Sequence, residues 1–392
     1  MKTLTRTWAD ISLDNLEYNY RSIRAHLPQG TKFLGVMKAD AYGHGAVPVS
    51  RALADLGAEY LAVSNLEEAV QIRRGEVRLP ILILGYTPAE YAANMIFLDI
   101  TQEVHSLEYA RELNEALAGT NYILNVHLKL DTGMTRIGFF AYDNERTLDE
   151  LRQVAQLPHL HIEGVFMHFC VADSRAEADV SFTKLQYKRF MDMLSAMAGV
   201  GIRPEIRHCC NSGATILYPE FALDMVRPGI ITYGNAPSDE LEGALSLRPM
   251  MSLHSMIAQV RTVPAGTDIS YGRLYRTKEE TRVAVLPIGY ADGLSRLLTG
   301  KASFYLQGKQ VPVIGRICMD MCMIDVSGVP EAKPGDVVTI FGYDDDGTLL
   351  PCERLARAQG TINYELLCQI SKRIPRICHR GAETSQILQY IV

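Results

Sequence analysis

The stretch FLGVMKADAYGHG, residues 33–45, joins a short apolar run to a polar turn that is rich in glycine. The apolar part, Phe33–Val36, has the length and composition of a buried strand. Lys38 follows this strand almost at once, so its amine is expected to lie partly out of water. Desolvation favours the neutral, nucleophilic form of an amine, which is the form that bonds to carbonyl carbon. A single lysine at the end of a strand usually has no chemical role. Whether Lys38 has one therefore depends on the residues predicted to lie near it.

Seven further strand-like runs follow in the first 226 residues: Tyr60–Val63, Ile81–Leu84, Ile96–Thr101, Ile123–Leu130, Ile162–His168, Glu205–Cys209 and Leu223–Val226. Helix-length amphipathic segments lie between them, namely Asn65–Arg74, Leu107–Ala118, Asn144–Ala155 and Phe182–Ala198. Eight strands that alternate with helices indicate parallel β/α units, and this number closes a barrel of the TIM type.

The pattern changes after about Leu247. Apolar, β-rich runs then dominate, with turns between them and little helix before residue 353: Leu253–Val263, Thr281–Ile288, Ala302–Ile317, Met323–Val326 and Val337–Phe341. We therefore predict an α/β chain with two domains, an eight-stranded β/α barrel over residues 1–246 and a mainly-β domain over residues 247–392.

Composition excludes several classes of function. The 392 residues carry 39 Lys and Arg against 45 Asp and Glu, a net charge of -6, which gives no reason to expect nucleic acid as a partner. The first residues lack the apolar stretch of a signal peptide, and no run is long enough to span a membrane, so a cytoplasmic protein is expected. The eight cysteines lack the spacing of a zinc site, and we predict reduced thiols and no metal.

Polar residues follow most of the predicted barrel strands. Lys38, Arg136, His168, Ser212 and Arg227 all lie at or soon after the carboxyl end of a strand. In such barrels the chemistry takes place in the loops at this end, so these side chains are expected to converge on one mouth.

Phosphate binding is indicated by two loops near the end of the barrel. Ser212 and Gly213 open a helix, and Gly229 and Ile230 follow the eighth strand. Their hydroxyl and main-chain N–H groups suit a phosphate, which barrels often bind after strands seven and eight.

The fifth strand contains an alternation of polar and apolar residues. Asn125, His127 and Lys129 alternate with aliphatic residues that suit the helix-facing side, so the polar face is expected to point into the barrel. A buried, unpaired ammonium is costly. Lys129 is therefore expected to be paired with a carboxylate or chemically altered, unless this strand is a half-exposed edge.

Stretches along the whole chain resemble one known family of enzymes. Residues 36–45 resemble the cofactor-lysine motif of the alanine racemases, which are fold type III pyridoxal-phosphate enzymes. Further stretches resemble the family in its own order: 129–138, 164–168, 211–212, 225–230, 270–272, 289–293, 315–320 and 364–376. The resemblance spans nearly the whole chain.

The resemblance implies a homodimer whose active sites are each completed by the second domain of the partner subunit, with pyridoxal 5'-phosphate as cofactor. Lys38 would hold the cofactor as a Schiff base and act as one base, and Tyr271 would be the second base. A phenol ordinarily keeps its proton at neutral pH, so Tyr271 would need activation, and His168 would contact it. Arg227 would hydrogen-bond the pyridine nitrogen and leave it unprotonated, which suppresses transamination.

The resemblance also implies which residues bind the remaining groups. The phosphate would be bound by Tyr42, Ser212, Gly229, Ile230 and Tyr364. The substrate carboxylate would be held by Arg136 and the main chain of Met319, with Asp320 lining the pocket and Tyr290 at its entrance. Lys129 would be carbamylated, and the carbamate would steady Arg136.

The expected activity is therefore the interconversion of L- and D-alanine by two-base proton transfer. Serine racemases share this scaffold, but they tend to carry a smaller polar residue where this chain has Tyr364, so alanine is favoured. Cys170, Asn235 and Met321 differ from the residues usual in the family. These positions lie at the rim of the pocket, so they bear on which amino acid is the substrate more than on the type of reaction. A non-catalytic pyridoxal-phosphate-binding protein would resemble the barrel alone, and a fold type III decarboxylase would need motifs that are absent from the C-terminal part.

Overall fold

The computed structural model describes residues 6–142 and 144–391, which form two compact units. One unit comprises residues 16–41 and 46–248. The other comprises 6–15, 42–45 and 249–391. The predicted domain boundary between residues 246 and 247 stays a prediction. In the structure, residues 6–15 and 42–45 belong to the same compact unit as residues 249–391.

Eight parallel strands form a nearly closed barrel in the first unit, which confirms the predicted fold. Around the ring they follow the order β10-β2-β3-β4-β5-β6-β8-β9. Two main-chain bonds join the first and last strands of this order: Asp224 N donates to Arg207 O at 3.1 Å, and Arg227 N donates to Cys210 O at 2.9 Å. The strands are β2 (Lys32–Val36), β3 (Tyr60–Val63), β4 (Ile81–Ile83), β5 (Ile100–Val104), β6 (Leu124–Asp131), β8 (Leu160–Phe166), β9 (Ile206–His208) and β10 (Met225–Val226). The short β7 (Phe139–Phe140) pairs with β6.

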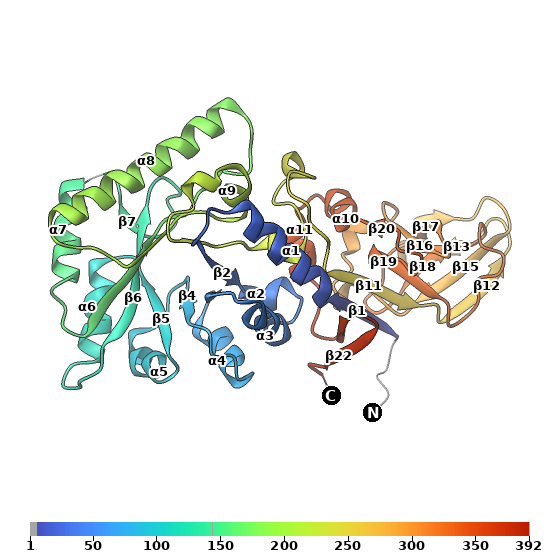
Figure 1. The fold of residues 1–392 in the computed structure, drawn as a ribbon. Helices are drawn as coiled ribbons and strands as arrows, with labels where there is room; N and C mark the ends of the chain where they lie inside the picture. Colours follow the sequence, from blue (N-terminus) through green and yellow to red (C-terminus); the bar gives the residue numbers. More distant parts are fainter. Residues whose placement is uncertain (1–5, 143, 392) are drawn as a thin grey trace. The chain divides into compact units, whose positions relative to one another are not determined.

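Helices cover the outer side of these strands, with α5 to α8 visible around the ring in Figure 1. None of the helices in the described part of the chain has the length and apolar character needed to cross a membrane. The helices are α1 (Leu13–His26), α2 (Lys38–Tyr42), α3 (Ala46–Leu56), α4 (Leu66–Arg74), α5 (Ala92–Phe97), α6 (Leu107–Ala116), α7 (Asn144–Val154), α8 (Glu177–Gly199) and α9 (Ser212–Leu217).

One predicted barrel strand is wrong in its boundaries. Ile96 and Phe97 end helix α5 instead of opening a strand, and β5 begins only at Ile100. Met95 is fully buried whereas Phe97 is 70% exposed, which is the pattern of an amphipathic helix. A short apolar run does not distinguish a helix from a strand, and Asp99, in the left-handed region at φ 51°, separates the two elements.

The second unit is mainly β, as predicted, and its main sheet follows the order β12-β15-β18-β17-β16-β19-β11-β1-β21-β22. The predicted run Ala302–Ile317 is a hairpin, because Gln307 and Gly308 both adopt positive φ and turn the chain. The strands of the second unit are β1 (Thr7–Ser12), β11 (Met251–Met256), β12 (Gln259–Val263), β13 (Asp268–Ile269), β14 (Tyr275–Arg276), β15 (Thr281–Leu286), β16 (Ser303–Leu306), β17 (Lys309–Ile314), β18 (Cys322–Asp325), β19 (Val337–Tyr343), β20 (Leu349–Leu350), β21 (Arg376–Arg380) and β22 (Glu383–Leu388). The helices of this unit are α10 (Cys352–Gln359) and α11 (Asn363–Cys368).

Strand β1 explains why the first residues belong to this sheet. Its side chains alternate between buried and half-buried, and Ala9 and Ile11 are fully buried. It pairs antiparallel with β11 and parallel with β21, so both of its edges are hydrogen-bonded. The alternation indicates that one face of this strand is turned to the core, while β11 and β21 satisfy the main-chain hydrogen bonds at its two edges.

Inside the barrel, Gly164 of β8 leaves room for the ring of His127 on β6, its register partner. A Cβ added to Gly164 would lie 2.5–2.6 Å from three atoms of that ring. We expect Gly164→Ala to lower the free energy of unfolding by about 1–3 kcal/mol, as overpacking of a core usually does. Urea denaturation measures the change.

Gly199→Ala is the matched control, because a Cβ there meets nothing within 4 Å and alanine favours the helical position at the end of α8. If both variants unfold at the same urea concentration, the close packing of Gly164 against His127 does not contribute to the free energy of unfolding.

Candidate active site

Lys38 opens α2, a single turn of left-handed helix. Ala39, Asp40 and Ala41 have φ of 53°, 55° and 55° with ψ near 50°, and Tyr42 has φ 52°. L-residues rarely adopt this conformation, and a run of them is rarer still. The turn must therefore be held by its surroundings.

Two carboxylates hold this turn. Asp40 Oδ1 accepts a hydrogen bond from Ala46 N at 2.8 Å, and Glu68 Oε1 accepts one from Ala39 N at 2.7 Å. Glu68 Oε2 also accepts from Ser64 N at 2.8 Å, which ties the turn to the end of β3. These hydrogen bonds fix the turn that carries Lys38 at the rim of the barrel.

Arg227 is 3% exposed and is bound through both terminal nitrogens. Nη1 donates to the main-chain oxygen of His208 at 3.1 Å and lies 3.0 Å from its ring Nδ1. Nη2 donates to the main-chain oxygens of Met167 and Cys209 at 2.7 and 3.1 Å, and lies 3.3 Å from Nδ1 of His168. Burial lowers the pKa of Arg227 to about 10, so it stays charged at neutral pH.

The Nε–H of Arg227 makes no hydrogen bond to any of the described residues, whereas Nη1 and Nη2 together make five contacts. A guanidinium has five N–H donors. The remaining donor on this buried group is therefore available to an acceptor that is not part of the chain.

Four positive charges act on His168. Its pKa is lowered well below the ordinary value by burial and then by the charges of Arg227, Lys129, Arg136 and Lys38. Arg227 contacts His168 directly, at 3.3 Å between Nη2 and Nδ1. The convergence of Lys38 and Arg136 on the same imidazole stays a prediction, which the effect of their charges on His168 supports.

Lys129 lies inside the barrel wall, because β6 pairs with β5 on one side and β8 on the other. The alternative that this strand is an exposed edge is therefore wrong. Lys129 is 4% exposed, and its Nζ lies 4.9 Å from the centre of the Phe166 ring. Burial, with the charges of Arg227 and Arg136, lowers the pKa of Lys129 to about 7.

The two predicted phosphate loops contact each other. Ser212 Oγ accepts a hydrogen bond from Gly229 N at 2.9 Å, which leaves its own proton available. Asn211 caps α9 by accepting from Ala214 N at 3.1 Å. Ile230 begins a short 3-10 helix (Ile230–Tyr233), so two helical N-termini meet here, and the first N–H groups of a helix have no acceptor within it.

The remaining predicted site residues lie in the second unit. Ser270 has φ 65°, and its Oγ donates to Arg316 O at 2.7 Å, which fixes the turn before Tyr271. Tyr290 N donates to Cys318 O at 3.1 Å, next to Met319.

Large side chains are exposed at these turns. Tyr271 is 69% exposed, Met319 54% and Tyr290 43%. Asp320 pairs with Arg373 at 2.8 Å. The rings of Tyr42 and Tyr364, both in this unit, lie 5.9 Å apart between centres.

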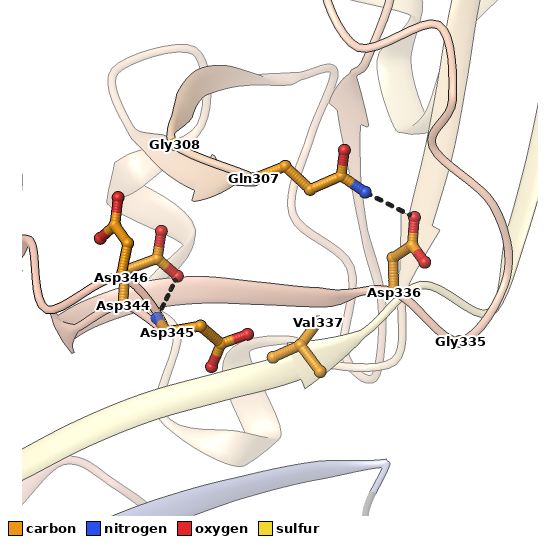
Figure 2. Close-up of a pocket in the computed structure, with 8 residues that line it drawn as sticks. All are labelled: Gln307, Gly308, Gly335, Asp336, Val337, Asp344, Asp345 and Asp346. Carbon is orange, nitrogen blue, oxygen red and sulfur yellow. Dashed lines mark hydrogen bonds between the residues drawn. The ribbon is translucent and has the colours of Figure 1, made fainter.

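Figure 2 shows a hollow elsewhere in the second unit that is lined by acidic side chains. Asp336 accepts from Gln307 Nε2 at 3.2 Å, and Asp344 accepts from Asp345 N at 3.0 Å. None of the predicted site residues lines it. Over residues 6–142 and 144–391, no group of three or more His, Cys, Asp or Glu side chains is arranged to hold a metal ion.

Comparison with known proteins gives one family for both halves of the chain. The family model "Alanine racemase, N-terminal domain" matches residues 11–237, and "Alanine racemase, C-terminal domain" matches residues 250–378. The alanine racemase of Desulfovibrio desulfuricans is 46% identical over 94% of this chain and 97% of its own length. The solved alanine racemase of Clostridium difficile 630 has a TM-score of 0.92 at 38% identity, with both chains fully covered. That of Bacillus anthracis, with bound L-Ala-P, has a TM-score of 0.92 at 35% identity, covering 100% of this chain and 99% of its own.

Proposed function

Because this chain belongs to the alanine racemase family, we propose that it interconverts L- and D-alanine by two-base proton transfer. The observation that supports this most is the contact of the buried Arg227 with His168, 3.3 Å between Nη2 and Nδ1, at the carboxyl ends of the barrel strands. The relatives are named alanine racemases, so alanine is the proposed substrate.

The barrel fits pyridoxal 5'-phosphate as the cofactor. Lys38 would bind it covalently, and the hydroxyl of Ser212 and the N–H of Ile230 would supply donors for its phosphate, together with the hydroxyls of Tyr42 and Tyr364. Gly229 would lie beside the phosphate and orient the Ser212 hydroxyl, to which its own N–H donates. When bound, the cofactor would withdraw electrons from an attached amino acid and acidify its α-hydrogen.

Arg227 fits the ring nitrogen of this cofactor, because its Nε–H has no acceptor among the described residues. An arginine donates and does not transfer its proton at neutral pH. The ring nitrogen would stay unprotonated, which weakens electron withdrawal and suits an enzyme that only moves an α-proton and avoids transamination.

Inversion requires a proton to leave one face of the α-carbon and another to arrive on the opposite face, so a second base is needed. We assign Lys38 Nζ and Tyr271 Oη as this pair, with His168 steadying Tyr271. Arg136 and the main chain of Met319 would orient the substrate carboxylate, with Asp320 lining the pocket and Tyr290 at the entrance.

The two bases would meet in a homodimer. Tyr271, Tyr290 and Met319 are large side chains exposed at neighbouring turns of the second unit, as expected of residues that enter the site of a partner subunit. Dimer formation would therefore complete each active site.

Lys129 is proposed to be carbamylated. A carbamate forms when a neutral amine attacks CO₂ and releases a proton, and a pKa of about 7 supplies neutral amine at physiological pH. We expect a ¹³C-carbamate NMR signal in ¹³C-bicarbonate above pH 7, its loss at pH 6, and its absence in Lys129→Ala. The carbamylation proposal fails if the signal is missing at pH 8 or persists in Lys129→Ala.

The proposed function is tested by incubating the cofactor-loaded protein with L-alanine and, separately, L-serine in deuterium oxide. Chiral chromatography follows the enantiomers, and mass spectrometry follows α-deuterium. Alanine should reach equal enantiomers much faster than serine. The opposite ranking would reassign the substrate, and inversion of neither would leave a cofactor-binding protein.

A further inference from the structure

Three side chains lie in a line behind Arg227 inside the barrel. The ring Nδ1 of His208 is 3.0 Å from Arg227 Nη1, and its Nε2 is 2.9 Å from Nδ1 of His127. Nε2 of His127 is 3.0 Å from Glu163 Oε2. These residues come from β9, β6 and β8, so the line crosses three strands of the barrel.

This line is closely packed. His127 and His208 are both fully buried, and Phe166 stacks on His208 with ring centres 4.9 Å apart. Gly164 lacks the Cβ that would strike the His127 ring. Neither ring can turn far without moving a strand.

The two ends fix the direction of every hydrogen bond in the line. An arginine only donates, so Nδ1 of His208 must accept. Burial lowers the pKa of both His127 and His208, so each ring is neutral and has one N–H. His208 therefore donates from Nε2 to His127 Nδ1, and His127 donates from Nε2 to Glu163.

Glu163 is held as a carboxylate. Burial alone would raise its pKa, but hydrogen bonds from His127, Tyr60 and Thr101 outweigh this effect and lower it. The Tyr60 hydroxyl donates to Oε1 at 2.9 Å, and the Thr101 hydroxyl donates to Oε2 at 3.3 Å.

We propose that Glu163 is a positioning residue for Arg227, acting through the tautomers of His127 and His208. Reversed tautomers would set an N–H of His208 against Nη1 of Arg227, and the guanidinium would lose the closer of its two side-chain acceptors, His208 Nδ1 at 3.0 Å against His168 Nδ1 at 3.3 Å. The consequence for catalysis rests on the proposed function, in which Arg227 Nε–H meets the cofactor ring nitrogen.

Glu163→Gln tests this proposal, because the amide keeps the size of the side chain but presents either an acceptor or a donor to His127. Its matched control is Glu59→Gln, which removes a barrel carboxylate that pairs with Arg24 at 2.6 Å and belongs to no part of the line. Tyr60→Phe removes one donor to Glu163 and leaves both rings untouched, so it should have a smaller effect.

Two readouts are needed. Proton–nitrogen NMR of ¹⁵N-histidine-labelled holoenzyme should give one tautomer for His127 and His208 in the wild type and in Glu59→Gln, and a second set of ring signals in Glu163→Gln. Steady-state kinetics should give a kcat about tenfold lower in Glu163→Gln with little change in KM, as for residues that orient a catalytic group.

Unchanged ring signals in Glu163→Gln, or a kcat equal to that of Glu59→Gln, overturns the proposal. If the wild type itself fails to racemise alanine, the proposed function is wrong. The ring signals still report whether Glu163 sets the tautomers.

Discussion

Replacing Lys38 with alanine is expected to abolish racemisation, with kcat/KM lower by about four orders of magnitude or more. The lysine has two proposed roles, as the covalent attachment of the cofactor and as one of two bases, and both are lost together. Chiral chromatography of alanine measures the loss, and the visible absorbance of the covalently bound cofactor should disappear with it.

Lys184→Ala is the control for this variant, because Lys184 lies exposed on helix α8. It should keep both the activity and the absorbance of the wild type. A Lys38→Ala protein that folds normally and racemises alanine at a rate near the wild type would refute the assignment of Lys38.

Tyr271→Phe is expected to lower the rate of inversion about 10²–10⁴-fold, the range for loss of a general acid–base. Exchange without inversion should persist, because Lys38 alone can remove the α-proton of one enantiomer and return one to the same face. In deuterium oxide that enantiomer should gain α-deuterium while the enantiomer ratio stays nearly constant.

Tyr275→Phe is a suitable comparison for this variant. Tyr275 lies on β14, packs on the small apolar cluster of the second unit and has no proposed role in catalysis. Wild-type inversion by Tyr271→Phe, or loss of exchange in both enantiomers, would mean that another group is the second base.

Mixing the two inactive variants tests whether the site is shared between subunits. In a mixed dimer of Lys38→Ala and Tyr271→Phe, one site would combine an intact Lys38 with an intact Tyr271 from the other copy. Activity should return on mixing after the subunits exchange. If the site is built within one chain, no activity returns.

Much of the site could be predicted because the functional residues of a β/α barrel lie at the carboxyl ends of its strands. Lys38, His168, Ser212 and Arg227 each follow a recognisable apolar strand, and parallel strands bring their carboxyl ends together. The buried position of Lys129 followed from a simple alternation along one strand.

Other features had no local signal. Tyr271, Tyr290 and Met319 lie in turns without periodicity, so only the family resemblance pointed to them. The line from Arg227 to Glu163 depends on register across β6, β8 and β9, and β9 has only three residues, too few to show an alternation.

The left-handed turn that carries Lys38 could not be predicted either, because alanine, aspartate and tyrosine do not favour positive φ. Each residue in that conformation costs roughly 1–2 kcal/mol, so four in succession, Ala39 to Tyr42, cost on the order of 4–8 kcal/mol in total. This is comparable to the whole stability of many domains. The same backbone would be relaxed for mirror-image residues. A chain made by chemical synthesis with D-alanine at positions 39 and 41 would therefore release part of that stored energy without altering any hydrogen bond of the turn.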